Sequence, residues 1–392
     1  MKVIVSGAGI AGLTVANQLA RNGIETVVVE QAPGPRPQGY MIDFFGPGYD
    51  AAEAMGVLAR ITELGYRIGE LVYLDERGHP RARLTMDTFE SAVGGRLVSI
   101  LRPDLELALR EHLPGTVELR YGRRLVGIDT TGSGAVTVAF ADGGRETADL
   151  LIGADGAHST VRRLVFGPDD RFLRYLGFHT AAYIFDEPEL ATELTGRYSL
   201  TDTADRQLGL YGLRDGRIAA FALHRTADPA LPDNVCAALK SEYATLGWLA
   251  PRALAHCPAP DDVYYDQVSQ VVMPAWSTGR VVLTGDACSA VSLMAGQGAS
   301  LAVAGGYILA DQLTRSASAD TAMAAYEHLW RPVVAEKQKV GRDLGRWFLP
   351  HSRLELITRR IALRLAGLPL VNRYLARITA GKPSHVIAQL RR

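Results

Sequence analysis

The first thirty residues contain the feature that most constrains how this chain can fold, a glycine-rich sequence between two short apolar runs. Residues 3–5 are typical of a buried parallel strand, and the sequence GAGIAG follows at residues 7–12. Apolar residues then recur at helical spacing, and a second apolar run, residues 26–29, ends at Glu30. A strand, a glycine-rich turn, a helix and a second strand with an acidic residue at its end form the pattern that binds a dinucleotide.

Each residue type in this unit has a physical reason. Gly7 permits the tight turn, Gly9 lets the backbone approach a diphosphate, and Gly12 lets the helix pack close to the strand. The helix N-terminus offers free amide N–H groups and a partial positive charge to the diphosphate, while Glu30 can accept hydrogen bonds from a ribose. The unit predicts a dinucleotide site, but it does not distinguish NAD(P) from FAD.

Composition limits the possible partners. The chain of 392 residues is long enough for two domains, and Lys and Arg balance Asp and Glu at 42 each, so we expect no nucleic-acid partner. No apolar run is long enough for a transmembrane segment. Because the glycine-rich unit begins at residue 3, cleavage of a signal peptide would destroy it, and we expect a cytoplasmic protein.

The cysteines indicate neither a metal site nor a redox centre. Cys236, Cys257 and Cys288 are far apart in the sequence and form no C-x-x-C pair. This spacing argues against a zinc site, a disulfide scaffold and a redox-active disulfide, and we expect no bound metal.

The remaining chain shows two kinds of sequence pattern. The first predicts helices at residues 49–60 and 102–112 and strands at residues 71–75, 81–85, 117–128, 135–140 and 146–152. From residue 172 to residue 271 the pattern changes to a mixed sheet, with strands at residues 197–200, 207–213 and 217–224 and one helix at residues 235–246. Residues 319–392 are predicted to form helices.

Two further motifs follow strand ends. Residues 153–162, GADGAHSTVR, place backbone amides and Asp155 at the carboxyl edge of a sheet, where doubly wound folds bind ligands. Residues 285–300, GDACSAVSLMAGQGAS, follow another apolar strand. There, Asp286 can bind a ribose or ribityl hydroxyl, and Gly296 and Gly298 leave an open backbone at a helix N-terminus that can stabilise an anion.

These three motifs, in this order, resemble the FAD-dependent aromatic monooxygenases of the para-hydroxybenzoate hydroxylase type, and are similar above all to the tetracycline-inactivating flavin monooxygenases and the aromatic polyketide hydroxylases. The resemblance implies an α/β fold with a Rossmann-like FAD-binding domain, a second mixed-sheet substrate domain and a helical C-terminal tail. The expected segments are residues 1–72, 96–171 and 272–318 for the FAD-binding domain, 73–95 and 172–271 for the substrate domain, and 319–392 for the C-terminal helices.

The resemblance also implies roles for individual residues. Arg102 matches an arginine that contacts FAD, Asp286 matches the aspartate that binds the ribityl chain, and residues 296–300 match the helix end that faces the flavin ring. Arg36 and Asp43 fall where related enzymes place a nicotinamide-contacting arginine and a flavin-contacting aspartate. The expected cofactor-binding residues are Gly7, Gly9, Ile10, Ala11, Gly12, Glu30, Arg36, Asp43, Arg102, Asp155, Asp286, Gly296, Gln297, Gly298 and Ala299.

Four positions depart from the family pattern around the third motif. The positions that are commonly alanine, histidine, proline and asparagine are here Cys288, Ser289, Leu293 and Ser300. FAD binding should be little affected, because Asp286 and the glycines provide it. The effect on oxygen chemistry stays open. Cys288 is expected to be a small buried hydrophobe rather than a redox thiol.

Candidates for the substrate pocket come from residues 172–271, which have the mixed-sheet pattern. They are Tyr183, Tyr198, Tyr211 and His224, although each fits an ordinary core or surface position as well. No general acid or base can be named. In the C-terminal region, an apolar stripe at helical spacing is surrounded by arginines, and we expect it to pack on the protein itself rather than on a membrane or a partner.

The implied activity is hydroxylation of an electron-rich aromatic or polyketide-like small molecule by FAD, NAD(P)H and molecular oxygen, through a flavin C4a-hydroperoxide. One alternative is a non-oxygenating flavoprotein reductase, dehydrogenase or cyclase, which the altered third motif supports. Another is a non-catalytic flavin-binding regulatory protein. The sequence determines neither the substrate nor the choice between NADH and NADPH. It also does not show whether the reaction is hydroxylation or Baeyer–Villiger oxidation, or whether the protein is a monomer or a homodimer.

Overall fold

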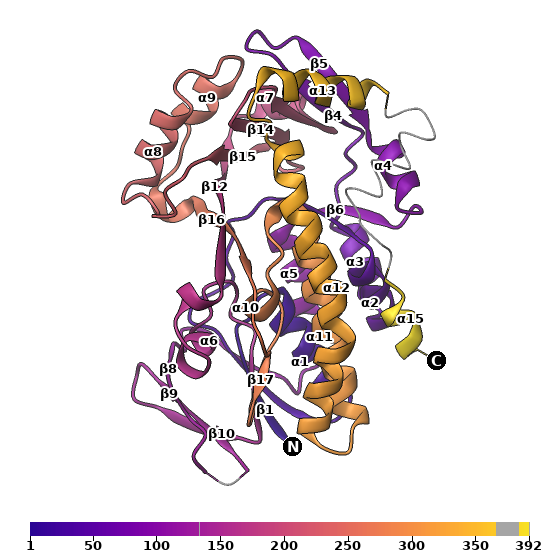
Figure 1. The fold of residues 1–392 in the computed structure, drawn as a ribbon, viewed down its shortest axis with the longest axis vertical. Coiled ribbons are helices and arrows are strands. Elements are labelled where there is room, and N and C mark those ends of the chain that lie inside the picture. Colours follow the sequence, from indigo (N-terminus) through magenta and orange to yellow (C-terminus); the bar gives the residue numbers. More distant parts are fainter. Residues whose placement is uncertain (133, 366–383, 392) are drawn as a thin grey trace.

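The computed structural model describes residues 1–132, 134–365 and 384–391, and the chain has an α/β fold with two large sheets (Figure 1). The lower sheet in this view has the strand order β17-β18-β11-β1-β2-β7. Its strands are β1 (Lys2–Ser6), β2 (Glu25–Val29), β7 (Glu118–Arg120), β11 (Leu150–Gly153), β17 (Ser277–Thr278) and β18 (Val281–Leu283). All its neighbouring strands are parallel except β17 and β18, as a doubly wound dinucleotide-binding sheet requires.

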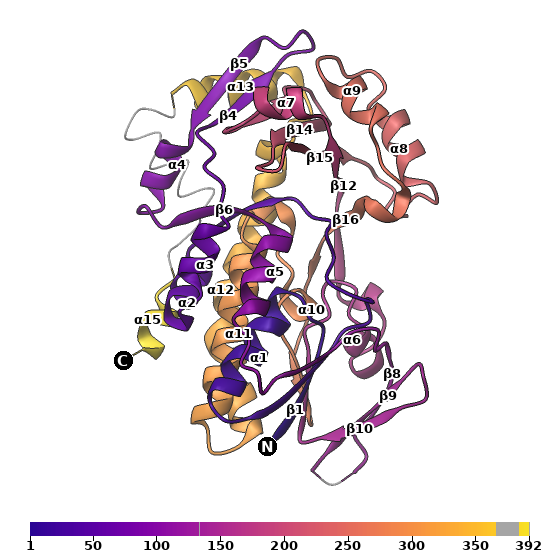
Figure 2. The ribbon, with the colours of Figure 1, turned by 180° about the vertical axis from the view of Figure 1, so that it is seen from behind.

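The upper sheet is mixed, as the sequence predicts, with the order β16-β12-β15-β14-β13-β4-β5. Its strands are β4 (Glu70–Leu74), β5 (Pro80–Thr85), β12 (Leu173–Asp186), β13 (Arg197–Thr201), β14 (Arg206–Gly212), β15 (Arg217–Arg225) and β16 (Tyr264–Val271). Only β13 and β4 pair in parallel. The long strands β12 and β16 extend from this sheet down toward the lower one, which is seen from both sides in Figures 1 and 2.

Two small sheets and a set of helices make up the other regular elements of the described residues. The small sheets contain β3 (Met41–Phe45) with β6 (Leu97–Leu101), and β8 (Leu125–Asp129) with β9 (Val136–Phe140) and β10 (Arg145–Ala148). The α-helices are α1 (Ile10–Arg21), α2 (Pro47–Met55), α3 (Leu58–Glu63), α4 (Met86–Ala92), α5 (Arg102–Glu111), α6 (Thr160–Val165), α7 (Pro188–Glu193), α8 (Val235–Glu242), α9 (Ala250–Ala255), α10 (Asp286–Ser289), α11 (Gly298–Arg315), α12 (Ala319–Phe348), α13 (Arg353–Arg364) and α15 (Val386–Leu390). Short 3₁₀ turns lie at Asp169–Arg171, Pro260–Asp262 and Leu293–Ala295.

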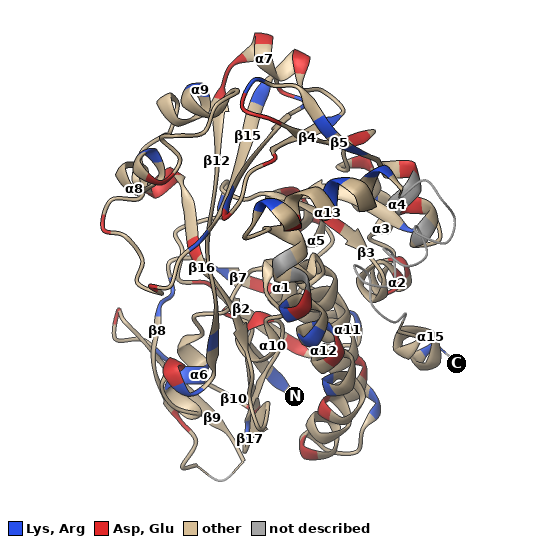
Figure 3. Cartoon of the chain, turned by 45° about the horizontal axis from the view of Figure 1, so that its top comes forward, with Lys and Arg blue, Asp and Glu red and all other residues tan. Residues whose placement is uncertain are grey.

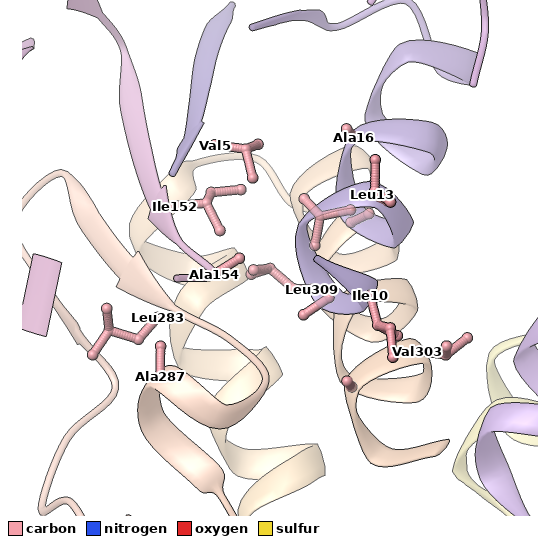
Figure 4. Close-up of a cluster of buried hydrophobic side chains, with 14 of the residues drawn as sticks. Val5, Ile10, Leu13, Ala16, Ile152, Ala154, Leu283, Ala287, Val303 and Leu309 are labelled. Carbon is pink, nitrogen blue, oxygen red and sulfur yellow. The ribbon is translucent and has the colours of Figure 1, made fainter. Parts of the chain in front are cut away.

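The core of the lower half forms where α1 and α11 pack against the parallel strands. Figure 4 shows Val5 and Ile152 from the strands facing Leu13 of α1 and Leu309 of α11, and all four are fully buried. The glycine-rich turn is compatible with this packing only without side chains, because a Cβ on Gly12 would lie 1.9 Å from the carbonyl oxygen of the turn. The dinucleotide motif therefore also determines how closely α1 approaches the sheet.

Three predicted elements are each two elements in the structure. The helix predicted at residues 49–60 ends at Gly56, whose φ of +79° is left-handed, and restarts as α3. The strand predicted at residues 117–128 is interrupted at Gly122, which has a φ of +69°. The strand predicted at residues 146–152 is divided because β10 belongs to the three-stranded sheet and β11 to the parallel sheet. The Asp149 carboxylate between them accepts a hydrogen bond of 2.7 Å from the backbone N–H of Lys2.

The apolar stripe near the C-terminus does not pack on the described part of the protein, so that prediction is wrong. The stripe is exposed by 44–70% and consists of Leu354, Ile357, Ile361 and Leu365. The opposite face of α13 is buried, and it includes Arg359, whose guanidinium binds buried Asp202 at 2.7 Å and lies 4.4 Å from the ring of Tyr73. Figure 3 shows the basic residues along α13. The rest of the predicted C-terminal helical region includes residues 366–383, which lie outside the described residues.

Candidate functional site

One cavity of about 440 Å³ is lined by both halves of the fold. The glycine-rich turn before α1, the start of α5, the loop after β11 and the residues between β18 and α11 form one part of its wall. Strands β12, β13, β15 and β16 of the mixed sheet form another. A volume of this size suits a small-molecule site.

The glycine-rich turn forms an open cradle at one end of the cavity. A Cβ on Gly9 would meet no described atom outside its own helix nearer than Glu106 Oε1, at 3.5 Å, so the backbone at Gly9 is accessible from the cavity. The carboxylate of Glu30 accepts hydrogen bonds from the backbone N–H groups of Ala8, at 2.9 Å, and Ala32, at 2.8 Å. Glu30 therefore holds the turn in place and retains oxygen lone pairs for a ligand.

Two side chains of opposite charge, Arg102 and Asp286, line the cavity and interact electrostatically. Arg102, the first residue of α5, forms an ion pair of 2.8 Å with Glu106, one turn later in the helix. Asp286, the first residue of α10, is enclosed by protein, but its side chain is open to the cavity. Burial raises the pKa of Asp286, and the positive charge of Arg102 partly offsets this effect. A hydroxyl-rich ligand would satisfy this carboxylate.

The second motif serves mainly to fix the loops around the cavity. Asp155 accepts hydrogen bonds from Ser159 Oγ, at 2.5 Å, and from the backbone N–H of Val161, at 3.1 Å. Arg162 is fully buried and donates to the carbonyl oxygens of Ala157, at 2.6 Å, and Ala287, at 2.8 Å. Arg162 thus connects the second motif to the third, and it has no surface left for a ligand.

The N-terminus of α11 also faces the cavity. Gly296 has a left-handed φ of +63°, and a Cβ on Gly298 would find open space. Ser300 lies behind them and is buried. Its hydroxyl accepts a hydrogen bond of 2.9 Å from the backbone N–H of Gly48 and donates to the carbonyl oxygen of Phe45. This departure from the family pattern therefore ties α11 to β3 and α2.

The other departures lie in the loop that leads to α11. Ser289 Oγ donates to the carbonyl oxygen of Gly285 at 2.7 Å. Cys288 is 1% exposed, and burial raises its pKa to about 12, so it is a protonated, buried thiol at neutral pH. Leu293 lines the cavity next to Ser292, whose φ of +74° is unusual for a residue other than glycine. The loop that bounds the cavity is therefore strained at Ser292, the residue before Leu293.

Aromatic side chains also line the cavity, and two of them, Tyr40 and Tyr264, lie near Arg102 and Asp286. The ring centroid of Tyr40 lies 5.6 Å from that of Phe221 on β15 and 5.8 Å from that of Tyr264 on β16. Tyr198 on β13 and Phe348 at the end of α12 also line the cavity. Burial raises the pKa of Tyr40 to about 12 and the pKa values of Tyr198 and Tyr264 well above 10, so all three hydroxyls are neutral donors.

The structure brings most of the predicted site residues to this one cavity. Those that line it are Gly7, Gly9, Ile10, Ala11, Glu30, Arg36, Asp43, Arg102, Asp155, Tyr198, Asp286, Gly296, Gly298 and Ala299. Gly12 and Gln297 lie outside the lining, and Gly12 serves the packing of α1. Among the described residues, no cluster of His, Cys, Asp and Glu could hold a metal ion. None of the described helices is long and apolar enough to span a membrane.

Three predicted pocket residues lie elsewhere. Tyr183 and His224 belong to the sheet face that α8 and α9 cover, where Tyr183 donates to the Ala253 carbonyl oxygen at 2.9 Å and His224 Nδ1 lies 3.1 Å from the Tyr243 hydroxyl. The hydroxyl of Tyr211 accepts a hydrogen bond of 2.7 Å from the Met41 N–H, outside the lining. Side chains alternate across a strand, and the sequence did not show which set faces the cavity.

Comparisons with known proteins agree with this site. The FAD binding domain family matches residues 1–338. A flavin-dependent monooxygenase from an unknown prokaryotic organism is 30% identical over 89% of this chain and 90% of its own length. The chain belongs to the FAD-dependent monooxygenase family. An uncharacterised protein of Mycobacterium tuberculosis is 38% identical over 79% of this chain and 84% of its own length. The crystal structure of tetracycline destructase Tet(51) has a TM-score of 0.82 and 26% identity, with 98% of each chain covered.

The cavity of this monooxygenase fits FAD. The open cradle at Gly9 suits a diphosphate, and the Asp286 carboxylate, open to the cavity without a hydrogen bond from a described residue, suits a polyhydroxyl chain. The N-terminus of α11, with the accessible backbone of Gly298, suits the ring end. Sequence analysis missed the ring cluster around Tyr40 and Tyr264, because these tyrosines are more than 200 residues apart in the sequence and meet only in the folded chain.

Proposed function

We propose that this monooxygenase uses NAD(P)H and molecular oxygen to hydroxylate an uncharged, electron-rich aromatic small molecule. The observation that carries the proposal is that one cavity is lined both by the predicted FAD-binding residues and by the aromatic cluster of Tyr40, Phe221 and Tyr264. Bound FAD supplies the redox chemistry, namely acceptance of a hydride from a nicotinamide and activation of oxygen. The protein supplies binding, orientation and exclusion of water.

The charge distribution in the cavity supports an uncharged substrate. The arginines of the lining, Arg36, Arg102, Arg110 and Arg123, come from the FAD-binding half. The mixed sheet contributes rings, hydroxyls and one carboxylate, Asp266, but no described cation. The mixed sheet therefore offers no arginine of its own to a substrate carboxylate, whereas a phenol can stack on the rings and accept hydrogen bonds from the neutral tyrosine hydroxyls.

We further propose that Arg36 contacts the nicotinamide cofactor and that Tyr198 orients the substrate. Arg36 lies on the irregular segment between β2 and β3 and reaches the cavity without forming an ion pair with a described residue. Tyr198 lines the cavity, and no described residue hydrogen-bonds to its hydroxyl. Arg36→Ala should raise the KM for NAD(P)H while FAD content and the kcat at saturating NAD(P)H stay unchanged. A simultaneous loss of FAD would contradict this role.

The test of the function uses the purified, FAD-loaded enzyme with pairs of aromatic compounds that differ only by a carboxylate. Uncharged phenols should stimulate NAD(P)H oxidation and yield a product that contains one atom from isotopically labelled oxygen gas. Preference for the carboxylated partner of each pair would refute the substrate class. Reduction of a compound without incorporation of labelled oxygen would instead establish the reductase alternative.

A further inference from the structure

Two thiols that are distant in the sequence meet on the outer side of the mixed sheet. Cys236 Sγ lies 2.6 Å from Cys257 Sγ, and both residues are partly exposed. A disulfide bond is about 2.0 Å long, so the two sulfur atoms need to approach by only about half an ångström. The sequence spacing argues against a redox-active disulfide, yet the fold brings Cys236 and Cys257 together.

The local structure holds both thiols in this position. Cys236 lies in the first turn of α8, whose N-cap, Asn234, accepts a hydrogen bond of 2.9 Å from the backbone N–H of Ala237. Cys257 follows α9, and the thiol of Cys236 donates to the carbonyl oxygen of Pro258 at 3.0 Å. Both helices pack on the same apolar cluster of the sheet, so neither can move freely relative to the other.

We propose that Cys236 and Cys257 form a reversible disulfide that links α8 to the turn after α9. With hydrogen peroxide as oxidant, one sulfur attacks the O–O bond, which breaks to give a sulfenic acid and one water. The second sulfur then displaces the sulfenic oxygen as a second water while the S–S bond forms. Two thiols are thus oxidised as one peroxide is reduced to two waters.

The environment of the pair affects the rate of this reaction. Burial and the neighbouring thiol raise the pKa of Cys257 to about 12, so this residue is a thiol at neutral pH. The thiolate is the reactive form of a cysteine, and attack by Cys257 should therefore be faster in alkaline buffer than near pH 7.

The disulfide would stiffen one wall of the substrate cavity from behind. Helices α8 and α9 cover one face of β12 and β15, and the opposite face of the same strands presents Thr180 and Phe221 to the cavity. A link between Cys236 and Cys257 closes the loop that contains both helices and restricts their separation from the sheet. Amide hydrogen exchange in residues 236–257 should be slower in the oxidised protein.

The proposal is tested on the full-length, FAD-loaded protein. After treatment with hydrogen peroxide, the sample is alkylated under denaturing conditions and digested with trypsin without reduction. We expect a mass lower by two hydrogens, alkylation of Cys288 alone, a cross-link between the peptides of residues 226–240 and 253–280, and reversal by dithiothreitol. Alkylation of both Cys236 and Cys257, or their oxidation to sulfinic acids without a cross-link, would overturn the proposal.

Matched variants make the assignment specific. Cys288→Ser should leave the cross-link intact. Cys236→Ser should abolish it and leave Cys257 with only single-cysteine products, and Cys236→Ala serves if the serine variant does not fold. A cross-link that includes Cys288 in the wild-type protein would refute the assigned pair.

Discussion

Glu30 offers the sharpest test of the cofactor site. Its carboxylate accepts hydrogen bonds from the backbone N–H groups of Ala8 and Ala32, and it lines the cavity at the glycine-rich turn. Glu30→Ala removes the acceptor that holds this turn, together with any hydrogen bond to the ribose of FAD. The substitution therefore acts on the shape of the cradle and on the ligand at once.

The magnitude follows from the number and type of these bonds. A hydrogen bond to a charged group contributes about 1.5–3 kcal/mol. Water can replace the carboxylate at the two backbone amides, because Glu30 is only partly buried. The net loss in FAD binding should then be close to one ribose hydrogen bond, which corresponds to a Kd roughly 10-fold to 150-fold higher.

The assay is a titration of apo-protein with FAD, followed by flavin fluorescence, with circular dichroism as the check of folding. Glu30→Gln should give an intermediate Kd, because its neutral amide oxygen can still accept a hydrogen bond from the ribose, although a weaker one than a carboxylate accepts. Glu25→Ala is the matched control, since this carboxylate lies at the exposed start of the same strand. An unchanged Kd for folded Glu30→Ala would refute the assignment of Glu30 to the FAD site.

Three other outcomes are expected. Asp202→Ala leaves Arg359 buried without its carboxylate and should lower the free energy of unfolding by about 3–5 kcal/mol in urea titrations. Arg360→Ala removes only the partly exposed partner of Asp202 and should lower it by less than about 1 kcal/mol. Ser300→Asn restores the usual family residue at a position without space for it and should lower stability by about 1–3 kcal/mol in the same assay. The hydrogen bond to Asp266 raises the pKa of His158, so its contribution is complete below the unfolded pKa of about 6.5 and is lost as pH rises through the higher folded value. The Tm of the wild type should exceed that of His158→Asn more at pH 5.5 than at pH 8.5, and an equal difference at both pH values would contradict this.

The parts of the site that sequence analysis located are those encoded by short segments. The turn at Gly7, Gly9 and Gly12 needs only one strand, one helix and one acidic residue, all within thirty residues. Arg102 and Asp286 could be assigned to the same site as this turn only because the three motifs occur in the order of the family. These signals depend on short segments and on their order along the chain, so they can be recognised without knowledge of how the fold packs.

The parts that sequence analysis missed depend on which strands become neighbours. Thr180 and Tyr183 lie on the same strand three residues apart, yet only Thr180 reaches the cavity, because alternation places them on opposite faces. Cys236 and Cys257 meet only because α8 and α9 share one apolar cluster. No sequence pattern in a single chain reports such long-range contacts.

The order of strands in the parallel sheet has a consequence for biosynthesis. Strand β1 pairs with β11, and β11 pairs with β18. The centre of the sheet can therefore form only after residues near 150 and then residues near 281 have been synthesised. At about 5–20 residues per second, a ribosome needs roughly 15 seconds to one minute to add the last of these strands. The nascent chain thus contains its first nucleotide-binding motif long before β18 and the residues that follow it have been synthesised. FAD is expected to bind only after β18 and the start of α11 have been synthesised, and a cell short of flavin would accumulate folded chains that still lack it.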